Sequence, residues 1–323
     1  MISSCRANSV LNNVCDLFAT SQISGQTCSL ICDSESAIIT DYQIGNDKHV
    51  LFIKVNGTTK IFKTLHPYFH EYDPLPNDLS EDAFKMAILE KVNNQTFLDF
   101  PIAFKDHVVS TIYSSFPTTQ ISLADKKSIW ALLQEPEFIN FKILKLSRVV
   151  PNIKSTCGHF YEVQNLLPFS MKSYYMNLKS KILLHLMGTL KLFYEFLNEP
   201  LEWCDATFEN LALSTEYVKR FVIMDADQLY TRAKLNKLLT AKTCQHNDDC
   251  TIKDCHSTCL NNKCSERVNE NLDVFCDKMV HQLYGNFYSK NNKFLTACNN
   301  NKFNRTKRLD DLRLAWAWTI PDV

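Results

Sequence analysis

Two aspartates and one asparagine have the types and spacing needed to hold a metal ion and to orient a hydroxyl group. Asp205 and Asn210 lie five residues apart, and an apolar run that begins at Phe221 ends at Asp225. Phosphoryl transfer uses one carboxylate to orient the attacking hydroxyl. It also uses an amide oxygen and a second carboxylate to hold the cation that bridges the nucleotide phosphates. These residues therefore indicate phosphoryl-transfer chemistry.

A long helix and two short strands are predicted around these residues. Residues 171–197 form the longest helix candidate, with apolar side chains at helical spacing as far as Leu197. Residues 211–213 and 221–224 are short apolar runs with a turn between them, which is typical of two strands. Asp225 would end the second strand.

The first half of the chain predicts strands followed by helices. Residues 37–44, 49–55 and 59–64 have strand patterns, and Asn56-Gly57 is a hairpin signal between the last two. Residues 81–93 predict a helix with Ser80 as its N-cap. This order predicts an α+β fold, or two lobes of different character.

Composition limits the class of protein. The chain has 323 residues, enough for one two-lobed domain or two small domains. Lys and Arg together number 35, as do Asp and Glu, and this balance argues against a nucleic-acid partner bound by bulk charge. With 45% hydrophobic residues, the chain is not globally disordered.

Thirteen cysteines and three glycosylation sequons indicate an oxidising compartment of the secretory pathway. The sequons begin at Asn56, Asn94 and Asn304. Against this reading, the first 25 residues contain no apolar stretch that fits a leader, and no later run reaches the roughly 18 apolar residues of a membrane span. We expect truncation or an isoform, with membrane contact only through an anchor absent from this chain.

The cysteine block at residues 244–276 has two interpretations. Its spacings lack paired Cys-x2-Cys knuckles, so disulfides are favoured over a zinc site that would include His246 and His256. Because thirteen is an odd number, one thiol is expected to be unpaired or paired with another chain. The spacing does not decide which cysteines form the disulfides. The candidates for disulfide bonds are Cys15, Cys28, Cys32, Cys244, Cys250, Cys255, Cys259, Cys264 and Cys276.

Several unusual blocks in order give a resemblance over nearly the whole chain. The chain resembles the divergent protein kinase domain family, whose members are cysteine-rich proteins of the endoplasmic reticulum. The blocks that carry the resemblance are residues 15–32, 121–134, 157–161, 204–210 and 244–276.

The resemblance implies a role for each candidate residue. Asp205 matches the catalytic-loop aspartate, Asn210 and Asp225 match the metal ligands, and Lys63 matches the strand lysine that contacts nucleotide phosphates. The partner of Lys63 would be a glutamate on the preceding helix, for which Glu137 is our choice and Glu135 the neighbour that competes with it. Without the resemblance, Lys63 would be interpreted as a strand lysine that faces solvent, and Asp225 as a polar residue that ends a strand.

The resemblance also implies the organisation and the ligands. It predicts a cysteine-containing segment at 1–36, an N-lobe at 37–165 and a C-lobe at 166–323. Glu162 and Gln164 would form the hinge against the adenine of ATP, which Mg²⁺ or Mn²⁺ would accompany. The acceptor, a protein, glycan or lipid, is not identified. Together, Asp205, Asn210 and Asp225 are expected to converge around one cation, with Lys63 facing them.

The chain departs from the kinase pattern in three places. Gly45 is the lone glycine where a phosphate-covering loop has several, and Thr207 replaces the lysine usual two residues after the catalytic aspartate. That replacement removes a cation that would neutralise the transferring phosphoryl group. The cysteine block stands where Ala-Pro-Glu is expected. A pseudokinase that acts as a luminal binding or scaffold module is therefore the alternative to an active kinase.

The resemblance also implies a degenerate EF-hand within residues 95–130. Its loop would run from Ser114 to Asp125, with Phe116 at a ligand position and Thr119 in the glycine position. An EF-hand needs carboxylates or amides early in the loop and a bidentate acid at its end. We therefore expect a vestigial helix pair that binds no calcium.

Overall fold

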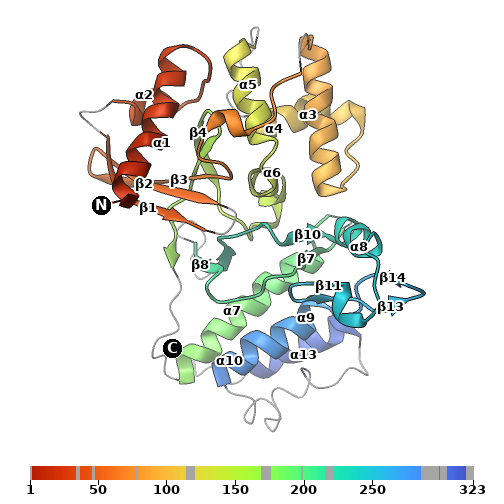
Figure 1. Ribbon diagram of the computed structural model, residues 1–323. Coiled ribbons are helices and arrows are strands. Elements are labelled where there is room, and N and C mark those ends of the chain that lie inside the picture. The colour runs from red at the N-terminus through yellow and green to blue at the C-terminus, as the bar shows by residue number, and fades with distance from the viewer. Residues whose placement is uncertain are drawn as a thin grey trace. The chain divides into compact units, whose positions relative to one another are not determined.

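The computed structural model is a mixed α and β structure with two compact units (Figure 1). The first unit comprises Met1–Lys145 and Pro151–Asn165, and the second comprises Leu146–Val150 and Leu166–Val323. Each unit is described by itself. The structure describes residues 2–33, 37–45, 48–76, 79–113, 121–168, 176–197, 199–214, 221–284, 298 and 304–317.

An antiparallel sheet with the strand order β1-β2-β3-β5-β4 organises the first unit. The three strands predicted from alternation are present as β1, β2 and β3. The five strands are β1 (Ala37–Ile44), β2 (His49–Val55), β3 (Thr58–Thr64), β4 (Ile153–Cys157) and β5 (Phe160–Val163).

The Asn56-Gly57 turn fixes the register between β2 and β3. Val55 pairs with Thr58, so the loop has two residues. Both are left-handed, with φ 49° at Asn56 and 80° at Gly57, as the twist of a two-residue hairpin requires. The predicted hairpin is confirmed, and its register places Lys63 opposite Val50 on β2.

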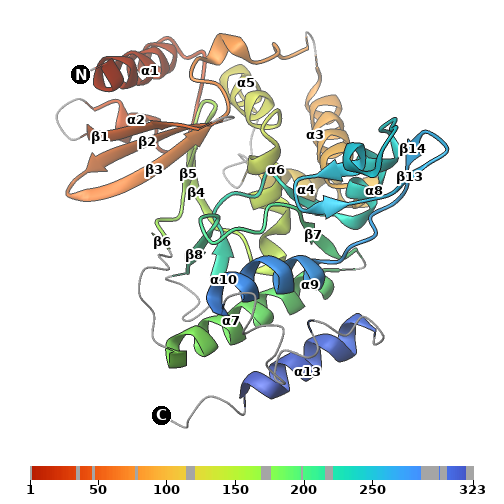
Figure 2. The ribbon, with the colours of Figure 1, turned by 60° about the horizontal axis from the view of Figure 1, so that its bottom comes forward.

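Two N-terminal helices cover part of this sheet (Figure 2). Helix α1 (Ile2–Ala19) packs against β1, and the short α2 (Cys28–Ile31) packs against β2. Apolar residues of α1 and of the sheet share one buried cluster, which includes Val10, Val14, Leu51, Ile53 and Phe62. The sequence analysis treated this segment only as cysteine-rich and did not predict α1.

The remaining helices of the first unit include α6, which carries Glu137, the residue that pairs with Lys63. The Ser80 hydroxyl accepts a hydrogen bond from Ala83 N, as predicted for an N-cap, and Pro136 begins α6. The helices are α3 (Glu81–Thr96), α4 (Lys105–Ile112), α5 (Leu123–Leu132) and α6 (Pro136–Ile143), with 3₁₀ turns η1 (Phe69–Glu71) and η2 (Ile102–Phe104).

The second unit is mainly helical and carries short strands. Helix α7 packs against α13 and against β7 and β9. Its principal helices are α7 (Met176–Tyr194), α8 (Arg232–Thr240), α9 (Asn271–Val274), α10 (His281–Tyr284) and α13 (Arg305–Ala317), with the π-helix η5 (Phe275–Val280). The 3₁₀ turn η4 spans Asn247–Cys250, and η3 (Leu144–Ser147) crosses from one unit into the other.

Within the described part of the second unit, the strands form one three-stranded sheet and three two-stranded ones. The order is β6-β8-β9 in the larger sheet, while β7 pairs with β10, β11 with β12 and β13 with β14. The strands are β6 (Leu167–Pro168), β7 (Leu201–Trp203), β8 (Leu211–Leu213), β9 (Phe221–Ile223), β10 (Leu229–Thr231), β11 (Thr251–Ile252), β12 (Cys255–His256), β13 (Cys259–Leu260) and β14 (Lys263–Cys264).

The described cysteine side chains form six disulfides, each within one unit. All nine candidates from the sequence are bonded to another cysteine. The pairs are Cys15–Cys32, Cys28–Cys157, Cys204–Cys255, Cys244–Cys259, Cys250–Cys264 and Cys276–Cys298.

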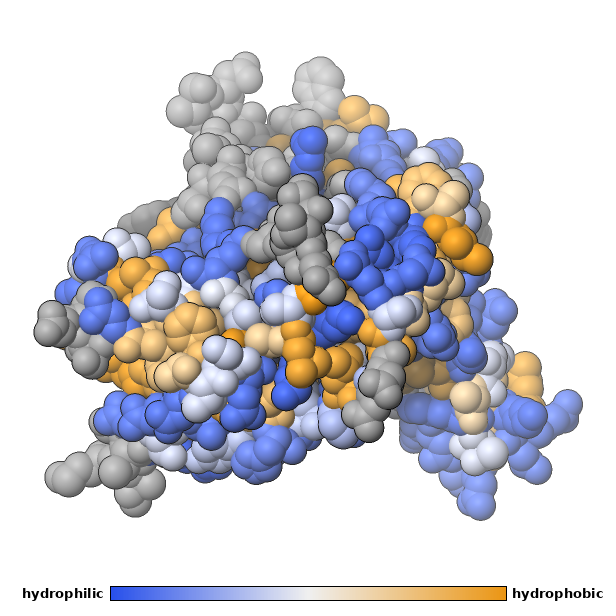
Figure 3. Space-filling model, turned by 90° about the horizontal axis from the view of Figure 1, so that it is seen from above, coloured by the Kyte–Doolittle hydropathy of each residue, from blue (hydrophilic) through white to orange (hydrophobic). Residues whose placement is uncertain are grey.

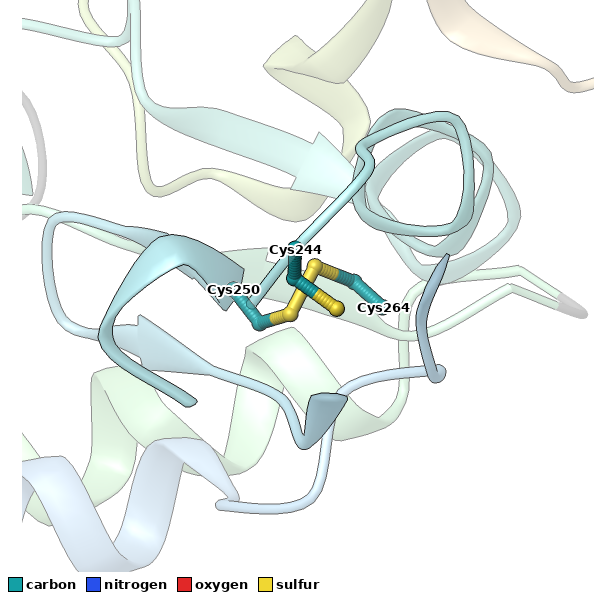
Figure 4. A group of neighbouring side chains, drawn as sticks. All are labelled: Cys244, Cys250 and Cys264. Carbon is teal, nitrogen blue, oxygen red and sulfur yellow. A yellow bond between two sulfur atoms is a disulfide. The ribbon is translucent and has the colours of Figure 1, made fainter. Parts of the chain in front are cut away.

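Two of the disulfides join the cysteine block at residues 244–276 to cysteines outside it. Cys255 and Cys276 pair outside residues 244–276, with Cys204 and Cys298. The sulfurs of Cys244, Cys250 and Cys264 lie close together, as in a metal site, but Cys250 is bonded to Cys264 (Figure 4). Zinc needs free thiolates, so disulfide formation excludes the zinc alternative here.

The surface mixes polar and apolar side chains. In the view of Figure 3, hydrophobic residues are interrupted by hydrophilic ones. Across the described ranges, no helix combines the length and the apolar character that a membrane span requires. The sequon residues Asn56, Asn94 and Asn304 are exposed.

Candidate active site

Lys63 and Glu137 form an ion pair in the first unit. Lys63 lies on β3, and its Nζ is 3.0 Å from Glu137 Oε1 on the first turn of α6. The Glu137 side chain is 2% exposed and that of Lys63 is 13% exposed. The cationic end of Lys63 also lies 5.4 Å from the centre of the Phe141 ring, one turn further along α6. A strand and a helix therefore hold this pair in a buried environment.

Two further side chains bind the Glu137 carboxylate. Lys48, just before β2, places its Nζ 2.9 Å from Oε2, and the Tyr161 hydroxyl donates a hydrogen bond of 2.7 Å to the same oxygen. Both carboxylate oxygens are thus bound to cations, which offsets the cost of burying the charge. Lys48 was not among the residues predicted from the sequence, although its position three residues after Gly45 was a usable signal.

Glu135, the alternative partner of Lys63, has a different role. It is fully buried, and its carboxyl group accepts hydrogen bonds from the Tyr72 hydroxyl at 2.5 Å and the Thr64 hydroxyl at 3.2 Å. Burial raises the pKa of Glu135 to about 8. Its neutral form is therefore favoured at acidic and neutral pH. The structure gives the charged pairing with Lys63 to Glu137.

A pocket of about 880 Å³ lies in the first unit. It is bounded by the segment that follows β3 and by α5, and Tyr72 and Lys126 are among its lining residues. None of the candidate site residues from the sequence lines it.

The two hinge candidates lie on and just after β5. The Glu162 carboxylate binds Lys60 Nζ at 2.7 Å and accepts a hydrogen bond from the Ser155 hydroxyl. The Gln164 backbone N–H donates to the carbonyl oxygen of Asn152 at 2.9 Å. These contacts join β5 to its neighbouring segments, and contact with adenine stays a prediction.

Asp205 and Asn210 are joined directly in the second unit. The Asn210 side-chain amide donates hydrogen bonds to Asp205 Oδ2 at 2.8 Å and to the Asp205 carbonyl oxygen at 3.1 Å. Asp205 follows β7 after Cys204, and Asn210 directly precedes β8. Because its nitrogen binds Asp205, the Asn210 side chain keeps its oxygen as a donor for a cation.

The β8–β9 pairing brings Asn210 and Asp225 to one end of a strand pair. Leu211 pairs with Ile223, and the Met224 N–H donates to the Asn210 carbonyl oxygen at 2.8 Å. Asp225 is the next residue, and its Oδ1 accepts from the Asp227 N–H at 3.2 Å. An amide oxygen and a carboxylate oxygen at this position are the ligand types that Mg²⁺ prefers.

Lys253 contributes a cation to this acidic group, which the sequence analysis did not foresee. Its Nζ lies 2.8 Å from Asp205 Oδ2, the oxygen that also binds Asn210. The hydrogen bond to Asp205 raises the pKa of Lys253, and the charges of Asp225 and Asp227 act in the same direction. Among the described atoms, Asp205 Oδ1 has no hydrogen-bond partner.

The sequence-predicted residues thus fall into two sets, one in each unit. Lys63 and Glu137 are together in the first, while Asp205, Asn210 and Asp225 are together in the second. Most of the proposed EF-hand loop, residues 114–120, lies outside the described residues; helices α4 and α5 precede and follow it.

Comparison with known protein families gives a match over residues 129–301 to the protein-kinase domain of FAM69. The matched range includes Glu137, Asp205, Asn210 and Asp225 and most of the cysteine-rich segments. It covers more than half of the 323 residues. This chain therefore belongs to the FAM69 family and carries its protein-kinase-like domain.

Proposed function

We propose that this protein is a phosphotransferase of the secretory pathway that transfers the γ-phosphoryl group of ATP to a hydroxyl group on a protein or glycan. The observation that carries the proposal is the arrangement of Asp205, Asn210 and Asp225 in the second unit. Asn210 binds Asp205 through its amide, and strand pairing sets it beside Asp225. A carboxylate for the hydroxyl and two oxygen donors for a cation are thereby supplied together.

In the proposed reaction, the acceptor hydroxyl oxygen attacks the γ-phosphorus and a new O–P bond forms. The bond between that phosphorus and the β–γ bridging oxygen breaks, and ADP leaves with the electron pair. The hydroxyl proton passes to Asp205, whose Oδ1 is the unoccupied carboxylate oxygen described above. Asn210 and Lys253 orient this carboxylate by holding Oδ2.

A divalent cation fits the donor set of the second unit. The Asn210 amide oxygen and the Asp225 carboxylate would hold Mg²⁺ or Mn²⁺, since both ions favour oxygen ligands. When bound, the cation would supply positive charge to the nucleotide phosphates. In the first unit, Lys63 would contact those phosphates, with its position fixed by Glu137.

The disulfides and the exposed sequons support the secretory part of the proposal. Six disulfides require an oxidising environment, and the three sequon asparagines are accessible to glycosylation. We further propose that the segment between α4 and α5 binds no calcium, because its sequence lacks most of the required carboxylates and amides.

A pseudokinase is the second candidate function, and Thr207 and the lone Gly45 favour it. The glycines of a phosphate-covering loop let the backbone approach the phosphates closely, and this chain lacks them. Such a protein would bind nucleotide without transferring phosphate and would act as a binding module in the lumen.

The test is release of ADP and incorporation of γ-phosphate by the pure protein with ATP and Mn²⁺ or Mg²⁺. We expect Asp225→Ala to lower the rate by roughly 10²-fold or more, because it removes a cation ligand. The matched control is Asp248→Ala, an exposed aspartate of the cysteine-rich region. Equal rates for wild type and Asp225→Ala would refute the phosphotransferase, and nucleotide binding without turnover would support the pseudokinase.

A further inference from the structure

We propose that Lys253 supplies the cation that neutralises the transferring phosphoryl group, in place of the catalytic-loop lysine that Thr207 replaces. The inference rests on the proposed phosphotransferase function, because it assigns one more residue to the same site. The positive charge that the catalytic loop lacks would be supplied by a residue 48 positions after Asp205 in the chain. The replacement of that lysine by Thr207 would then no longer argue against catalytic activity.

The side chain of Lys253 lies where such a cation is needed. Its Nζ is 2.8 Å from Asp205 Oδ2, and 54% of the side chain is exposed, against 22% for Asp205. An ammonium group with this exposure can bind a carboxylate and still donate N–H bonds to a ligand. Asp225 and Asp227 are near enough to influence it electrostatically. Lys253 therefore contacts the proposed base, and the aspartates near the proposed cation site act on its charge.

The backbone at Lys253 has an uncommon conformation for a lysine. Lys253 and Asp254 form the two-residue turn between β11 and β12, in which Ile252 pairs with Cys255. Lys253 has φ 48°, a left-handed value that glycine adopts without steric cost. Residues with such strain cluster at functional sites. A lysine at this position is consistent with a use for its side chain.

Three connections tie this turn to the catalytic loop. The disulfide Cys204–Cys255 joins the residue before Asp205 to a residue just after the turn. The Asp254 N–H donates to the Cys204 carbonyl oxygen at 2.9 Å, and the Ala206 N–H donates to Asp254 Oδ2 at 2.8 Å. Asp254 is buried, and Lys278 also binds its carboxylate. These connections therefore hold the loop and the turn rigidly together, and they fix the position of Lys253 before substrate binds.

The chemistry required of Lys253 is electrostatic. During transfer, negative charge is spread over the three equatorial oxygens of the phosphoryl group. The ammonium group would donate hydrogen bonds to those oxygens, and no bond to Lys253 would form or break. A fixed cation in a partly desolvated site lowers the energy of this charge distribution more than mobile water does.

The first experiment measures ADP release and phosphate incorporation with Mn²⁺–ATP for four variants. We expect Lys253→Met to lower kcat by about 10²-fold, and Lys253→Arg to retain activity to within about tenfold of wild type. The double variant Lys253→Met/Thr207→Lys should recover at least about tenfold, because it returns the cation to its usual position. Lys263→Met, at an exposed lysine on β14, is the matched control and should equal wild type.

The second experiment measures nucleotide affinity and needs no turnover. Because Lys253 would contact the γ-phosphate, Lys253→Met should weaken binding of Mn²⁺–ATP by about tenfold. It should change ADP affinity by less than about twofold, since ADP lacks that phosphate. A purely structural role for Lys253 would alter both affinities alike.

The outcomes separate this inference from the proposed function. A wild-type protein that transfers phosphate, with Lys253→Met equal to or faster than wild type, would overturn the role of Lys253 and leave the phosphotransferase intact. A protein that binds ATP but does not turn over refutes the phosphotransferase, and the ATP–ADP comparison then decides whether Lys253 recognises the γ-phosphate. Absence of nucleotide binding in the wild type would overturn both.

Discussion

The two units each hold a lysine against a carboxylate of the candidate site, but the two pairs differ in burial and in the means of positioning. Lys63 and Glu137 are buried, and a strand and a helix place them. Lys253 and Asp205 are more exposed. A disulfide places the lysine, together with the hydrogen bond from Asp254 N–H to the Cys204 carbonyl oxygen and the one from Ala206 N–H to the Asp254 carboxylate. Burial makes the first pair part of the fold, whereas exposure leaves the second available to a ligand.

The largest effect is expected from Glu137→Ala. This change removes the anion that Lys48 and Lys63, each 13% exposed, share. Removing one partner of a buried ion pair typically costs roughly 3–5 kcal/mol, because the remaining charge stays buried. Denaturant unfolding of wild type and variant measures the loss.

The matched control for this change is Glu90→Ala, at an exposed glutamate on α3. A surface substitution of this kind should alter the free energy of unfolding by less than about 0.5 kcal/mol. If Glu137→Ala costs no more than Glu90→Ala, the first pair is not part of the fold and the contrast between the units fails.

The pair in the first unit was implied by the family resemblance, and local sequence signals located only the strand that carries Lys63. Strand patterns and the Asn56-Gly57 turn located β3, whereas Glu137 was chosen as the partner of Lys63 on the resemblance. In the second unit, the apolar runs located β8 and β9 and so placed Asn210 and Asp225 at the strand ends. Residues that depend on the local pattern of one element could be predicted.

A second, smaller effect is expected from the pH dependence of Glu135. Its pKa in the folded protein, about 8, lies above the ordinary value of 4.5. The folded state therefore retains a proton that the unfolded chain releases, so this contribution to stability is complete below about pH 4.5 and is lost as the pH rises through 8. Between about pH 6 and pH 7.5, wild type should lose up to roughly 2 kcal/mol relative to Glu135→Gln.

The measurement is the free energy of unfolding of both proteins across that range. Glutamine keeps an oxygen that can accept the hydrogen bond from Tyr72, and it has no titration. The difference between the two proteins isolates Glu135, because their other titrating groups are the same. A difference that stays constant with pH would show that Glu135 ionises normally and that the buried network is more hydrated than its contacts indicate.

Lys253 could not be predicted, because its position depends on contacts between distant residues. Lys253 lies in a cysteine-rich segment whose connectivity the spacing left open, and Cys255 pairs with Cys204 rather than within the block. Helix α1 escaped prediction for a related reason. Its apolar residues, such as Val10 and Val14, pack against a sheet whose strands come later in the sequence. Positions set by cross-links and tertiary packing require the structure.

The smallest effect on stability is expected at Lys253, and its size separates a functional lysine from a structural one. The exposed pair with Asp205 should contribute less than about 1 kcal/mol, so Lys253→Met should unfold almost as wild type does. Lys253→Gly should also change stability by less than about 1 kcal/mol, because relief of the left-handed strain offsets the greater freedom of the unfolded chain. Denaturant unfolding beside the ATP-binding assay tests both. Losses of roughly 3 kcal/mol or more in the two variants would show that Lys253 stabilises the fold as the buried Lys63–Glu137 pair does, and the distinction between the two pairs would disappear.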